Sequence, residues 1–404
     1  MQYLIDYIQK YGDAYLIEKP LNEIDLLIFS QLIYNDFKGI LSDGEMLLKD
    51  AAVKFYEKFT NEQLEGLLDV ANRAARLLSL CAGTKRFGSV KVKNFIDNIN
   101  DAIDKQICAA NFVLQDGTTV VTFRGTDASV AGFKESAMLA YMFPVPAQIE
   151  ALHYFQETAM LSKGDVYACG HSKGGNLAVF AAVNCSNSLK RKIDGIYAYD
   201  APGFPEWFFE RYDYRQIRDK IQLYNPQSSL VGRALHMERE PHIVRSDAKI
   251  SRQHSVATWV IEDDAFATVE RYDEESDKLA AYLNDLVVQV GEEDLDAFYN
   301  ALEETAEKLG VYNFYDLKNV DKNLMFIILD SVQSLNPEQK ERFIALVKKV
   351  IADAAKDYVS GAATKAKGAI QNVTQNVTKR MPFKMKKKHK DGTTDSAPSP
   401  LTEE

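Results

Sequence analysis

The sequence predicts an α/β fold with a mainly parallel sheet and flanking helices. Between residues 107 and 224, short runs of β-branched and aromatic residues alternate with stretches of helical periodicity, which is typical of parallel strands joined by helices. The glycine-rich segment 170–175 directly follows one apolar run and opens a helical one. Strand patterns become scarce after Ile261, so we also expect a C-terminal helical extension.

The composition is that of an ordinary globular protein. The chain has 404 residues, of which 46% are hydrophobic, enough for a sizeable core. Its net charge of −10 argues against nucleic acid as a partner. The four cysteines are widely spaced, so neither a disulfide framework nor a zinc site is expected, and no motif implies a cofactor. No signal-peptide pattern or run of 18 apolar residues occurs, which predicts a cytoplasmic protein.

The elements are expected in the following order. The first 105 residues are predicted to be mostly helical, with Asn22 and Thr60 as N-caps. Residues 107–114 and 119–124 flank Gln115-Asp116-Gly117, a strong signal for a β-hairpin. Further strands are predicted at 165–169, 193–199 and 220–224, and a helix at 176–183.

Three regions of the chain differ in composition. We expect an α/β domain over residues 1–262, a charged helical extension over 263–360 and a disordered basic tail over 361–404. Within the tail, residues 379–390 hold seven Lys or Arg interleaved with Met and Phe. An anionic membrane and nucleic acid both attract such a cluster. We predict peripheral contact with an anionic membrane, at its inner face. A solvated tail without a partner is the alternative.

The segment Gly170-His171-Ser172-Lys173-Gly174-Gly175 predicts a catalytic serine. A sharp turn between a strand and a helix exposes the Ser172 hydroxyl and requires small residues two positions away, here Gly170 and Gly174. The N-terminus of the following helix favours negative charge that develops there. The alternative interpretation is a tight glycine turn with a capping serine.

A second turn is predicted where the strand ending at Arg124 meets Gly125 and Thr126. The backbone N–H groups of Thr126 and of Lys173, the residue after the serine, are the expected oxyanion hole. The Thr126 hydroxyl is a candidate for an additional donor. Alternatively, Thr126 or Asp127 caps a helix.

Together these segments resemble the class 3 lipases of the α/β-hydrolase superfamily, and most closely a group of bacterial lipase-like proteins. The resemblance covers about residues 1–262. It implies the α/β-hydrolase fold and serine-hydrolase chemistry with Ser172 as nucleophile. The shared motifs are Phe-Arg-Gly-Thr-Asp (123–127), Gly-His-Ser-Lys-Gly-Gly-Asn-Leu-Ala (170–178), Asp-Ala-Pro-Gly-Phe (200–204), Asn-Pro-Gln-Ser-Ser (225–229) and Gln253-His254 near Trp259.

The general base is expected among the histidines that follow the serine, because the order in this fold is serine, acid, histidine. Of these, His254 lies in polar sequence just before a last apolar run, and it also matches the family position. We therefore predict His254 as the base. A structural role for His254 is the alternative.

The acid is less clearly indicated. Asp200 ends a predicted strand at the sheet edge where catalytic groups gather. Class 3 lipases take their aspartate from the loop after the next strand, and here that loop, 225–229, has no carboxylate. Asp200 either orients His254 or accepts hydrogen bonds within its own turn, and both interpretations stay open. Asn225 and Ser228 are candidates for a neutral partner.

Two further features bear on the site. The Lys173 side chain is a cation near a helix N-terminus, so we expect an ion pair with Glu135 or Asp127, with an anionic substrate as the alternative. The apolar segment 131–149 occupies the position of a lid or acyl-binding wall in lipases. The alternative is an ordinary helix that covers the sheet.

The sequence thus predicts a serine hydrolase that cleaves a carboxylic ester, of a lipid or another acyl compound, through an acyl-enzyme on Ser172. The competing interpretation is a non-catalytic protein with the hydrolase fold that acts as a binding or membrane-associated scaffold. Its main support is the missing carboxylate at 225–229.

Overall fold

The computed structural model describes residues 1–341, apart from 42–43, 66–68, 128, 249 and 312–323. All of these belong to one compact unit, Met1–Ala354. The predicted tail, 361–404, with its basic segment 379–390, lies outside the described residues. The domain boundary expected at residue 262 stays a prediction.

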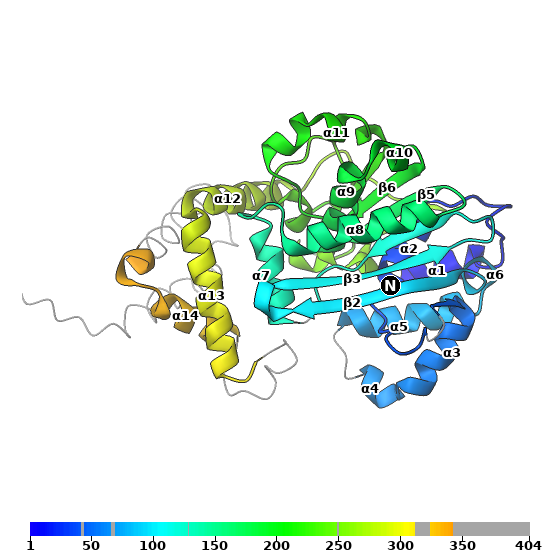
Figure 1. Cartoon of the computed structure of the whole chain (residues 1–404), viewed down its shortest axis with the longest axis horizontal. Helices are drawn as coiled ribbons and strands as arrows, with labels where there is room; N and C mark the ends of the chain where they lie inside the picture. The colour runs from blue at the N-terminus through cyan, green and yellow to red at the C-terminus, as the bar shows by residue number, and fades with distance from the viewer. Residues whose placement is uncertain (42–43, 66–68, 128, 249, 312–323, 342–404) are drawn as a thin grey trace, which may run out of the picture. The chain divides into compact units, whose positions relative to one another are not determined.

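Eight strands of the described chain form one sheet in chain order, β1 to β8 (Figure 1). The first four pair antiparallel, and β4 to β8 pair parallel. The expected mainly parallel sheet with flanking helices is therefore confirmed. The strands are β1 Glu45–Leu47, β2 Lys91–Asn100, β3 Lys105–Val113, β4 Thr119–Phe123, β5 Val166–His171, β6 Ile193–Tyr199, β7 Ile221–Pro226 and β8 His242–Val244; β9 Ile261–Glu262 and β10 Ala265–Phe266 form a small separate pair.

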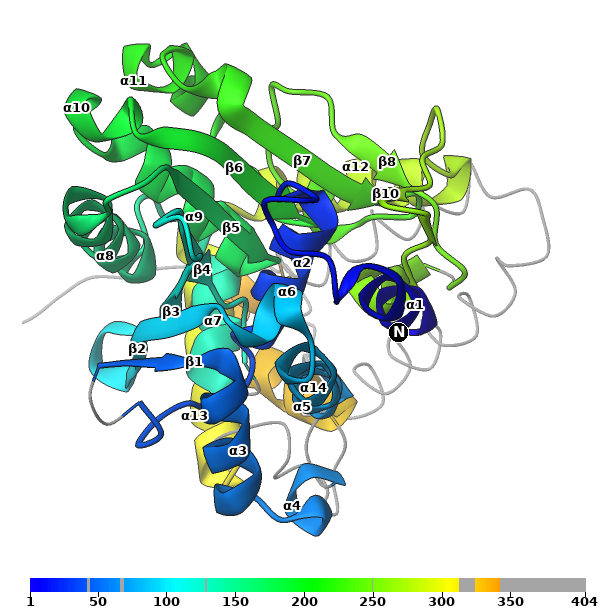
Figure 2. The same ribbon diagram turned by 90° about the vertical axis from the view of Figure 1, so that its right-hand side faces the viewer.

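Helices cover both faces of the sheet (Figure 2). Side chains alternate along each strand, so neighbouring residues of β3 enter opposite cores: Cys108 packs with the helices of one face and Ala109 with those of the other. The first face carries α1 Gln2–Tyr11, α2 Glu23–Leu32, α3 Leu48–Lys58, α5 Asp69–Ala82 and α6 Lys85–Gly88; the second carries α8 Pro146–Leu161, α9 Lys173–Asn184 and α11 Tyr212–Arg215.

The remaining described helices lie in loops or after the sheet. They are α4 Asn61–Glu65, α7 Val130–Met138, α10 Asn187–Lys190, α12 Glu274–Val290, α13 Glu292–Lys308 and α14 Leu324–Ser334; the 3-10 helices are η1 Asp101–Ile103, η2 Glu206–Glu210, η3 Arg218–Lys220, η4 Val231–Arg233, η5 Ile250–His254 and η6 Val256–Thr258.

Several local expectations are confirmed. Asn22 caps α2 in a capping box with Asp25. The Thr60 hydroxyl accepts a hydrogen bond from the backbone N–H of Gln63 at the start of α4. The hairpin predicted around Gly117 joins β3 to β4 in antiparallel register.

The expectation of a mostly helical segment up to residue 105 is wrong for residues 91–100, which form β2. Only Val92 of its ten residues is buried, so its side chains carry little strand periodicity. It is a strand because its backbone pairs with β3 over most of its length. That pairing is a tertiary contact and overrides local preference.

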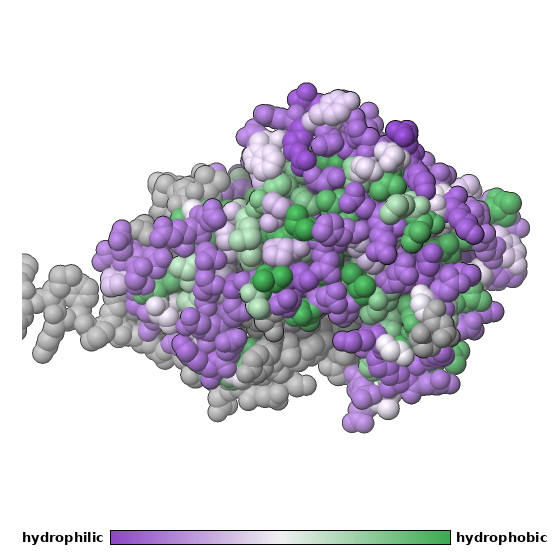
Figure 3. Space-filling view, viewed as in Figure 1, coloured by the Kyte–Doolittle hydropathy of each residue, from purple (hydrophilic) through white to green (hydrophobic). Residues whose placement is uncertain are grey.

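Among the helices after the sheet, α13 is joined to the domain through α7, and α12 through bonds from Asn284 and Asp277 to residues 233–235. The Lys134 ammonium on α7 bonds the Glu303 carboxylate on α13 at 2.6 Å, and the rings of Phe133 and Tyr299 lie 6.4 Å apart. In the described residues, no helix has the length and apolar character needed to cross a membrane. Hydrophilic side chains dominate the face drawn in Figure 3, and hydrophobic ones form small patches between them.

Candidate active site

The turn from β5 to α9 carries Ser172. Its backbone has φ 57° and ψ −134°, a strained conformation for a residue with a side chain. A Cβ at Gly170 would lie 2.2 Å from the backbone of Gly174, and one at Gly174 would lie 2.1 Å from the carbonyl oxygen of Phe123. Only glycines therefore fit at these two positions. The Ser172 side chain makes no capping hydrogen bond to α9, which argues against the capping-serine interpretation.

His254 and Asp200 lie in direct contact. The Nδ1 atom of His254 is 2.6 Å from Oδ2 of Asp200. The histidine side chain is 34% exposed, whereas the aspartate side chain is 1% exposed. Asp200 follows β6 and His254 ends η5, so the two residues come from elements 54 positions apart in the chain.

Asp200 accepts two further hydrogen bonds through its other oxygen. The donors are the Ser229 hydroxyl and, at 3.0 Å, the backbone N–H of Gly232. Burial on its own would raise the pKa of Asp200, but the bonds from His254 and Ser229 and the nearby charge of His254 hold it below its ordinary value. The carboxylate is thus ionised at neutral pH and both of its oxygens have partners.

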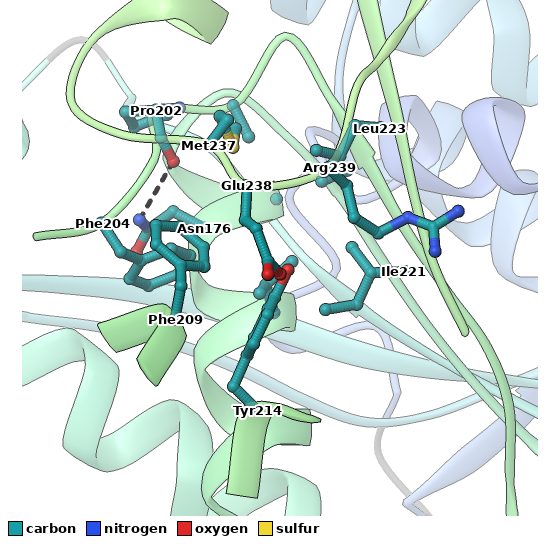
Figure 4. Close-up of a pocket in the computed structure, with 14 residues that line it drawn as sticks. Asn176, Pro202, Phe204, Phe209, Tyr214, Ile221, Leu223, Met237, Glu238 and Arg239 are labelled. Carbon is teal, nitrogen blue, oxygen red and sulfur yellow. Dashed lines mark hydrogen bonds between the residues drawn. The ribbon is translucent and has the colours of Figure 1, made fainter. Parts of the chain in front are cut away.

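The turn after Asp200 is fixed to helix α9. The Asn176 side chain donates to the carbonyl oxygen of Pro202 at 3.1 Å (Figure 4). It also donates to the carbonyl oxygen of Gly203 at 2.9 Å. The pocket drawn there has a volume of about 10 Å³, room for about one water molecule. It therefore holds no ligand of substrate size, and the contacts around Asn176 serve to position Asp200.

The His254 loop is held by its neighbour Gln253. The side-chain oxygen of Gln253 accepts a hydrogen bond from the backbone N–H of Ser228 at 2.8 Å, and the backbone carbonyl oxygen of Gln253 accepts one from the Trp259 indole. The candidate neutral partners of His254 bond elsewhere: Asn225 donates to Gly232 and Tyr272, and the Ser228 hydroxyl to Asp273. Through its hydrogen bonds, the Asn-Pro-Gln-Ser-Ser segment therefore positions Asp200 and the loop that carries His254.

His171 directly precedes Ser172, so it is not among the histidines after the serine that are expected to supply the base. In the structure its Nε2 atom is 2.9 Å from the backbone carbonyl oxygen of His254, and the two rings lie 4.5 Å apart. Burial and the neighbouring His254 lower the pKa of His171 to about 3. The ring is neutral, so Nε2–H donates to His254, and Nδ1 faces the Tyr34 hydroxyl at 3.5 Å.

The expected oxyanion turn lies beside the serine. A Cβ at Gly125 would be 3.2 Å from the Cβ of Ser172 and 2.5 Å from the Tyr34 hydroxyl. The adjacent Thr126 lines the same cavity as Ser172. Lys173 is the first residue of α9, so its backbone N–H has no acceptor within the helix.

The side chains of this turn form hydrogen bonds with residues of α7 and its N-cap. The Ser136 hydroxyl donates to the carbonyl oxygen of Gly132, so the hydrogen shared between Thr126 and Ser136 belongs to Thr126. The Thr126 hydroxyl is therefore not an extra donor in this conformation. Ser129 caps α7, and Asp127 accepts hydrogen bonds from Ser129 rather than capping the helix itself.

The Lys173 side chain forms the expected ion pair with Glu135. Its ammonium lies 2.8 Å from the Glu135 carboxylate and 2.7 Å from both the backbone and side-chain oxygens of Gln106. Glu135 also accepts from the backbone N–H groups of Gln106 and Ala147. Burial lowers the pKa of Lys173. This network anchors α7 to α9, so the Lys173 side chain is not directed at a substrate.

A cavity of about 960 Å³ connects these residues. Its size is at the upper end of ordinary ligand pockets. Ser172, His254, Thr126 and Lys173 all line it, together with apolar side chains of α7. Phe133, in the segment expected to form a lid or acyl-binding wall, is 42% exposed and lines the cavity as well. In the described residues, no group of His, Cys, Asp or Glu has the arrangement of a metal site.

The mainly parallel sheet, the helices on both faces and the serine at the β5–α9 turn define an α/β-hydrolase type of fold. The sequence profile of the Mbeg1-like family matches residues 81–304. The match spans more than half of the chain, so the protein belongs to the Mbeg1-like family. Its match continues past residue 262 into α12 and α13.

Comparison with other proteins adds little beyond the family. Curated protein sequences give no match. Among solved structures, the chain is similar to the M37 lipase at 15% identity and a TM-score of 0.33, covering 54% of this chain and 70% of that one. It is also similar to the Rhizomucor miehei lipase in its propeptide complex, at 11% identity and a TM-score of 0.33, covering 55% and 68%.

Proposed function

We propose that the protein is a serine hydrolase that cleaves a carboxylic ester of a lipid or another acyl compound. The observation that carries this proposal is the Asp200–His254 hydrogen bond, in which His254 lines the same cavity as Ser172. An ionised, buried carboxylate on Nδ1 holds the imidazole in the tautomer whose Nε2 accepts a proton.

The proposed mechanism uses residues of this chain alone. His254 Nε2 takes the proton of the Ser172 hydroxyl while Oγ attacks the ester carbonyl carbon. The backbone N–H groups of Lys173 and Thr126 stabilise the oxyanion that forms. Collapse of this intermediate breaks the bond to the alcohol, which leaves with the proton from His254. Water, deprotonated by His254, then attacks the acyl-enzyme and releases the acid and Ser172.

The scaffold alternative rests on the absence of a carboxylate in the 225–229 loop. Asp200, which directly follows β6, supplies a carboxylate to His254 instead, at 2.6 Å, so the missing residue is not a reason against catalysis. The strained backbone of Ser172 also favours catalysis, because a purely structural turn has no need of that strain. The Ser172 hydroxyl makes no capping hydrogen bond to α9, so it has no structural role in the helix.

Replacement of Ser172 by alanine tests the proposal. We expect Ser172→Ala to abolish labelling by a fluorophosphonate probe and hydrolysis of nitrophenyl esters of graded chain length. The melting temperature should stay near wild type, because the hydroxyl caps nothing. The exposed Ser188→Ala is the matched control and should retain full labelling. Labelling of Ser172→Ala would identify another nucleophile, and an unlabelled wild-type protein would favour the scaffold.

The cytoplasm, with peripheral contact at the inner membrane face through residues 379–390, is part of the proposal. Its support is the basic segment itself and the four cysteines, which are all free and buried. Free thiols are typical of a reducing compartment.

A further inference from the structure

The helices after the sheet reach the cavity that Ser172 lines. Leu283 on α12 and Tyr299 on α13 are among its lining residues, together with Phe133 on α7. We call these three side chains the apolar wall. Building on the proposed function, we propose that the substrate is an ester of a medium- or long-chain acyl group, and that its acyl chain lies against the apolar wall.

The α7 part of the apolar wall is fixed close to the serine. A Cβ on Gly125 would lie 3.2 Å from the Cβ of Ser172. The hydroxyl of Thr126, the next residue, bonds to the Ser136 hydroxyl on α7. Phe133 precedes Ser136 by three positions, so both side chains lie on one face of the helix, and both line the cavity. The Phe133 side of α7 is therefore tied to the oxyanion turn.

Helix α13 lies beside α7 (Figure 1). The ring of Tyr299 is 6.4 Å from the ring of Phe133, and it stacks on Tyr141 at the same centroid distance. The two helices are also joined by the ion pair of Lys134 with Glu303, whose nitrogen and oxygen atoms lie 2.6 Å apart. Contacts on both sides of the ring thus hold Tyr299 at the cavity next to Phe133.

Helix α12 joins the apolar wall from the side of the catalytic acid. The Asn284 side chain bonds to backbone groups of the loop 233–235, at 2.8 and 3.0 Å. Ala234 in this loop lines the cavity, and so does Leu283, the neighbour of Asn284. The residue just before the loop donates its backbone N–H to Asp200. The loop that holds the acid therefore also places Leu283 at the cavity.

The apolar wall leaves hydrophobic surface uncovered. Phe133 and Leu283 are 42% and 40% exposed although they line a cavity. None of the described residues of α7, α12 and α13 that line this cavity is charged. An apolar group that covers the wall would remove this surface from water, which is favourable. The wall therefore suits the hydrocarbon part of a substrate rather than a charged head group.

The chemistry of the proposed mechanism indicates which part of the ester meets the wall. Ser172 and His254 line the same cavity as the wall, so an ester at Ser172 is the molecule that reaches it. His254 gives its proton to the leaving alcohol, so the alcohol lies toward His254. The acyl chain then extends the other way, past the oxyanion turn and along α7.

The effect of the wall can be measured per methylene group. Each CH2 that passes from water to an apolar surface improves binding roughly fourfold. Two esters of one alcohol that differ only in acyl length react by the same chemistry at Ser172. The ratio of their kcat/KM values therefore reports the contacts of the additional methylenes, and loss of one wall side chain should lower it by at least about fourfold.

The experiment measures kcat/KM of the full chain for nitrophenyl octanoate and nitrophenyl butyrate. Leu283→Gln makes one wall residue polar at similar size. Leu279→Gln is its matched control, because Leu279 lies one turn earlier on α12, is 37% exposed and does not line the cavity. We expect wild type to favour the octanoate, and the ratio to fall at least about fourfold in Leu283→Gln only. An unchanged ratio in Leu283→Gln, or an equal fall in both variants, would overturn the inference.

Tyr299 is tested in the same assay. Tyr299→Ala removes the ring and should also lower the ratio by at least about fourfold. Tyr299→Phe keeps the ring and should retain the wild-type ratio. An equal fall in both Tyr299 variants would assign the effect to the hydroxyl group and contradict an apolar wall.

Binding to Ser172→Ala separates this inference from the proposed function, because it does not depend on catalysis. Octanoate should bind more tightly than butyrate in calorimetry, and the additional Leu283→Gln change should reduce the difference. No preference for octanoate would refute the acyl site even where esters are hydrolysed. A preference that Leu283→Gln reduces, without any hydrolysis by wild type, would refute the enzyme and leave the apolar site.

Discussion

Replacement of Asp200 by asparagine separates its catalytic role from its structural one. Asparagine has nearly the same shape and tolerates the φ of 45° found at this position. It replaces one carboxylate oxygen by an NH2 group, however. In the wild-type protein, one carboxylate oxygen of Asp200 accepts hydrogen bonds from Ser229 and Gly232, and the other bonds to His254. The amide can satisfy only one of these two sets.

The structure indicates which set is kept. An NH2 group facing the backbone N–H of Gly232 would leave two buried donors opposed, at a cost of about 1–3 kcal/mol. The amide oxygen therefore keeps Ser229 and Gly232, and the NH2 faces Nδ1 of His254. That orientation forces the proton of the imidazole onto Nε2, the atom that must accept the proton of Ser172. In serine proteases the corresponding change lowers kcat about 10⁴-fold, equal to about 5.5 kcal/mol of activation free energy.

We therefore expect Asp200→Asn to lose three to four orders of magnitude in kcat while its unfolding free energy falls by at most about 3 kcal/mol. The assay is nitrophenyl ester hydrolysis alongside urea unfolding followed by circular dichroism. Ser229→Ala is the control, because it removes one hydrogen bond from Asp200 but keeps the carboxylate on His254. Its loss of activity should be much smaller.

Wild-type activity in Asp200→Asn would remove Asp200 from the mechanism. Failure of the variant to fold, with Ser229→Ala also unfolded, would instead show that Asp200 is held for its turn alone. Either result would contradict a catalytic role for the Asp200–His254 pair.

Three other predictions concern stability and the tail. Burial lowers the pKa of His171 to about 3, whereas histidine in an unfolded chain titrates at about pH 6.5. As pH falls below about 6.5, the unfolded chain therefore binds a proton that the folded protein does not, and the unfolding free energy decreases. Between pH 7 and pH 5, wild type should lose about 2 kcal/mol more unfolding free energy than His171→Gln. Lys173→Met leaves Glu135 buried without its cation and should lower the unfolding free energy by about 3–5 kcal/mol. The double variant with Glu135→Gln should recover part of this unfolding free energy. Losses that simply add in the double variant would exclude a coupled pair. Full-length protein should co-sediment with anionic vesicles and lose this binding at high salt, because each basic residue near the membrane surface contributes about 1 kcal/mol. A 1–378 truncation should not bind. Equal sedimentation of both proteins would refute the membrane role.

Features with a local cause could be predicted from the sequence alone. The N-cap at Asn22 and the hairpin at Gly117 each depend on a few adjacent residues. The same holds for the turn at Ser172, where glycines two positions before and after are required by steric contact within the turn. The mainly parallel sheet followed from the alternation of strand and helix patterns.

Features that join distant segments were decided only by the tertiary structure. The sequence left the role of Asp200 open, since nothing near either residue encodes its contact with His254 across 54 positions. The choice of Glu135 over Asp127 as partner of Lys173 depends on how α7 packs on α9. Strand β2 exists through its pairing with β3, and the cavity gains Tyr299 from a helix after the sheet. Local patterns specify most of the elements, but burial and backbone pairing between elements decide which side chains meet.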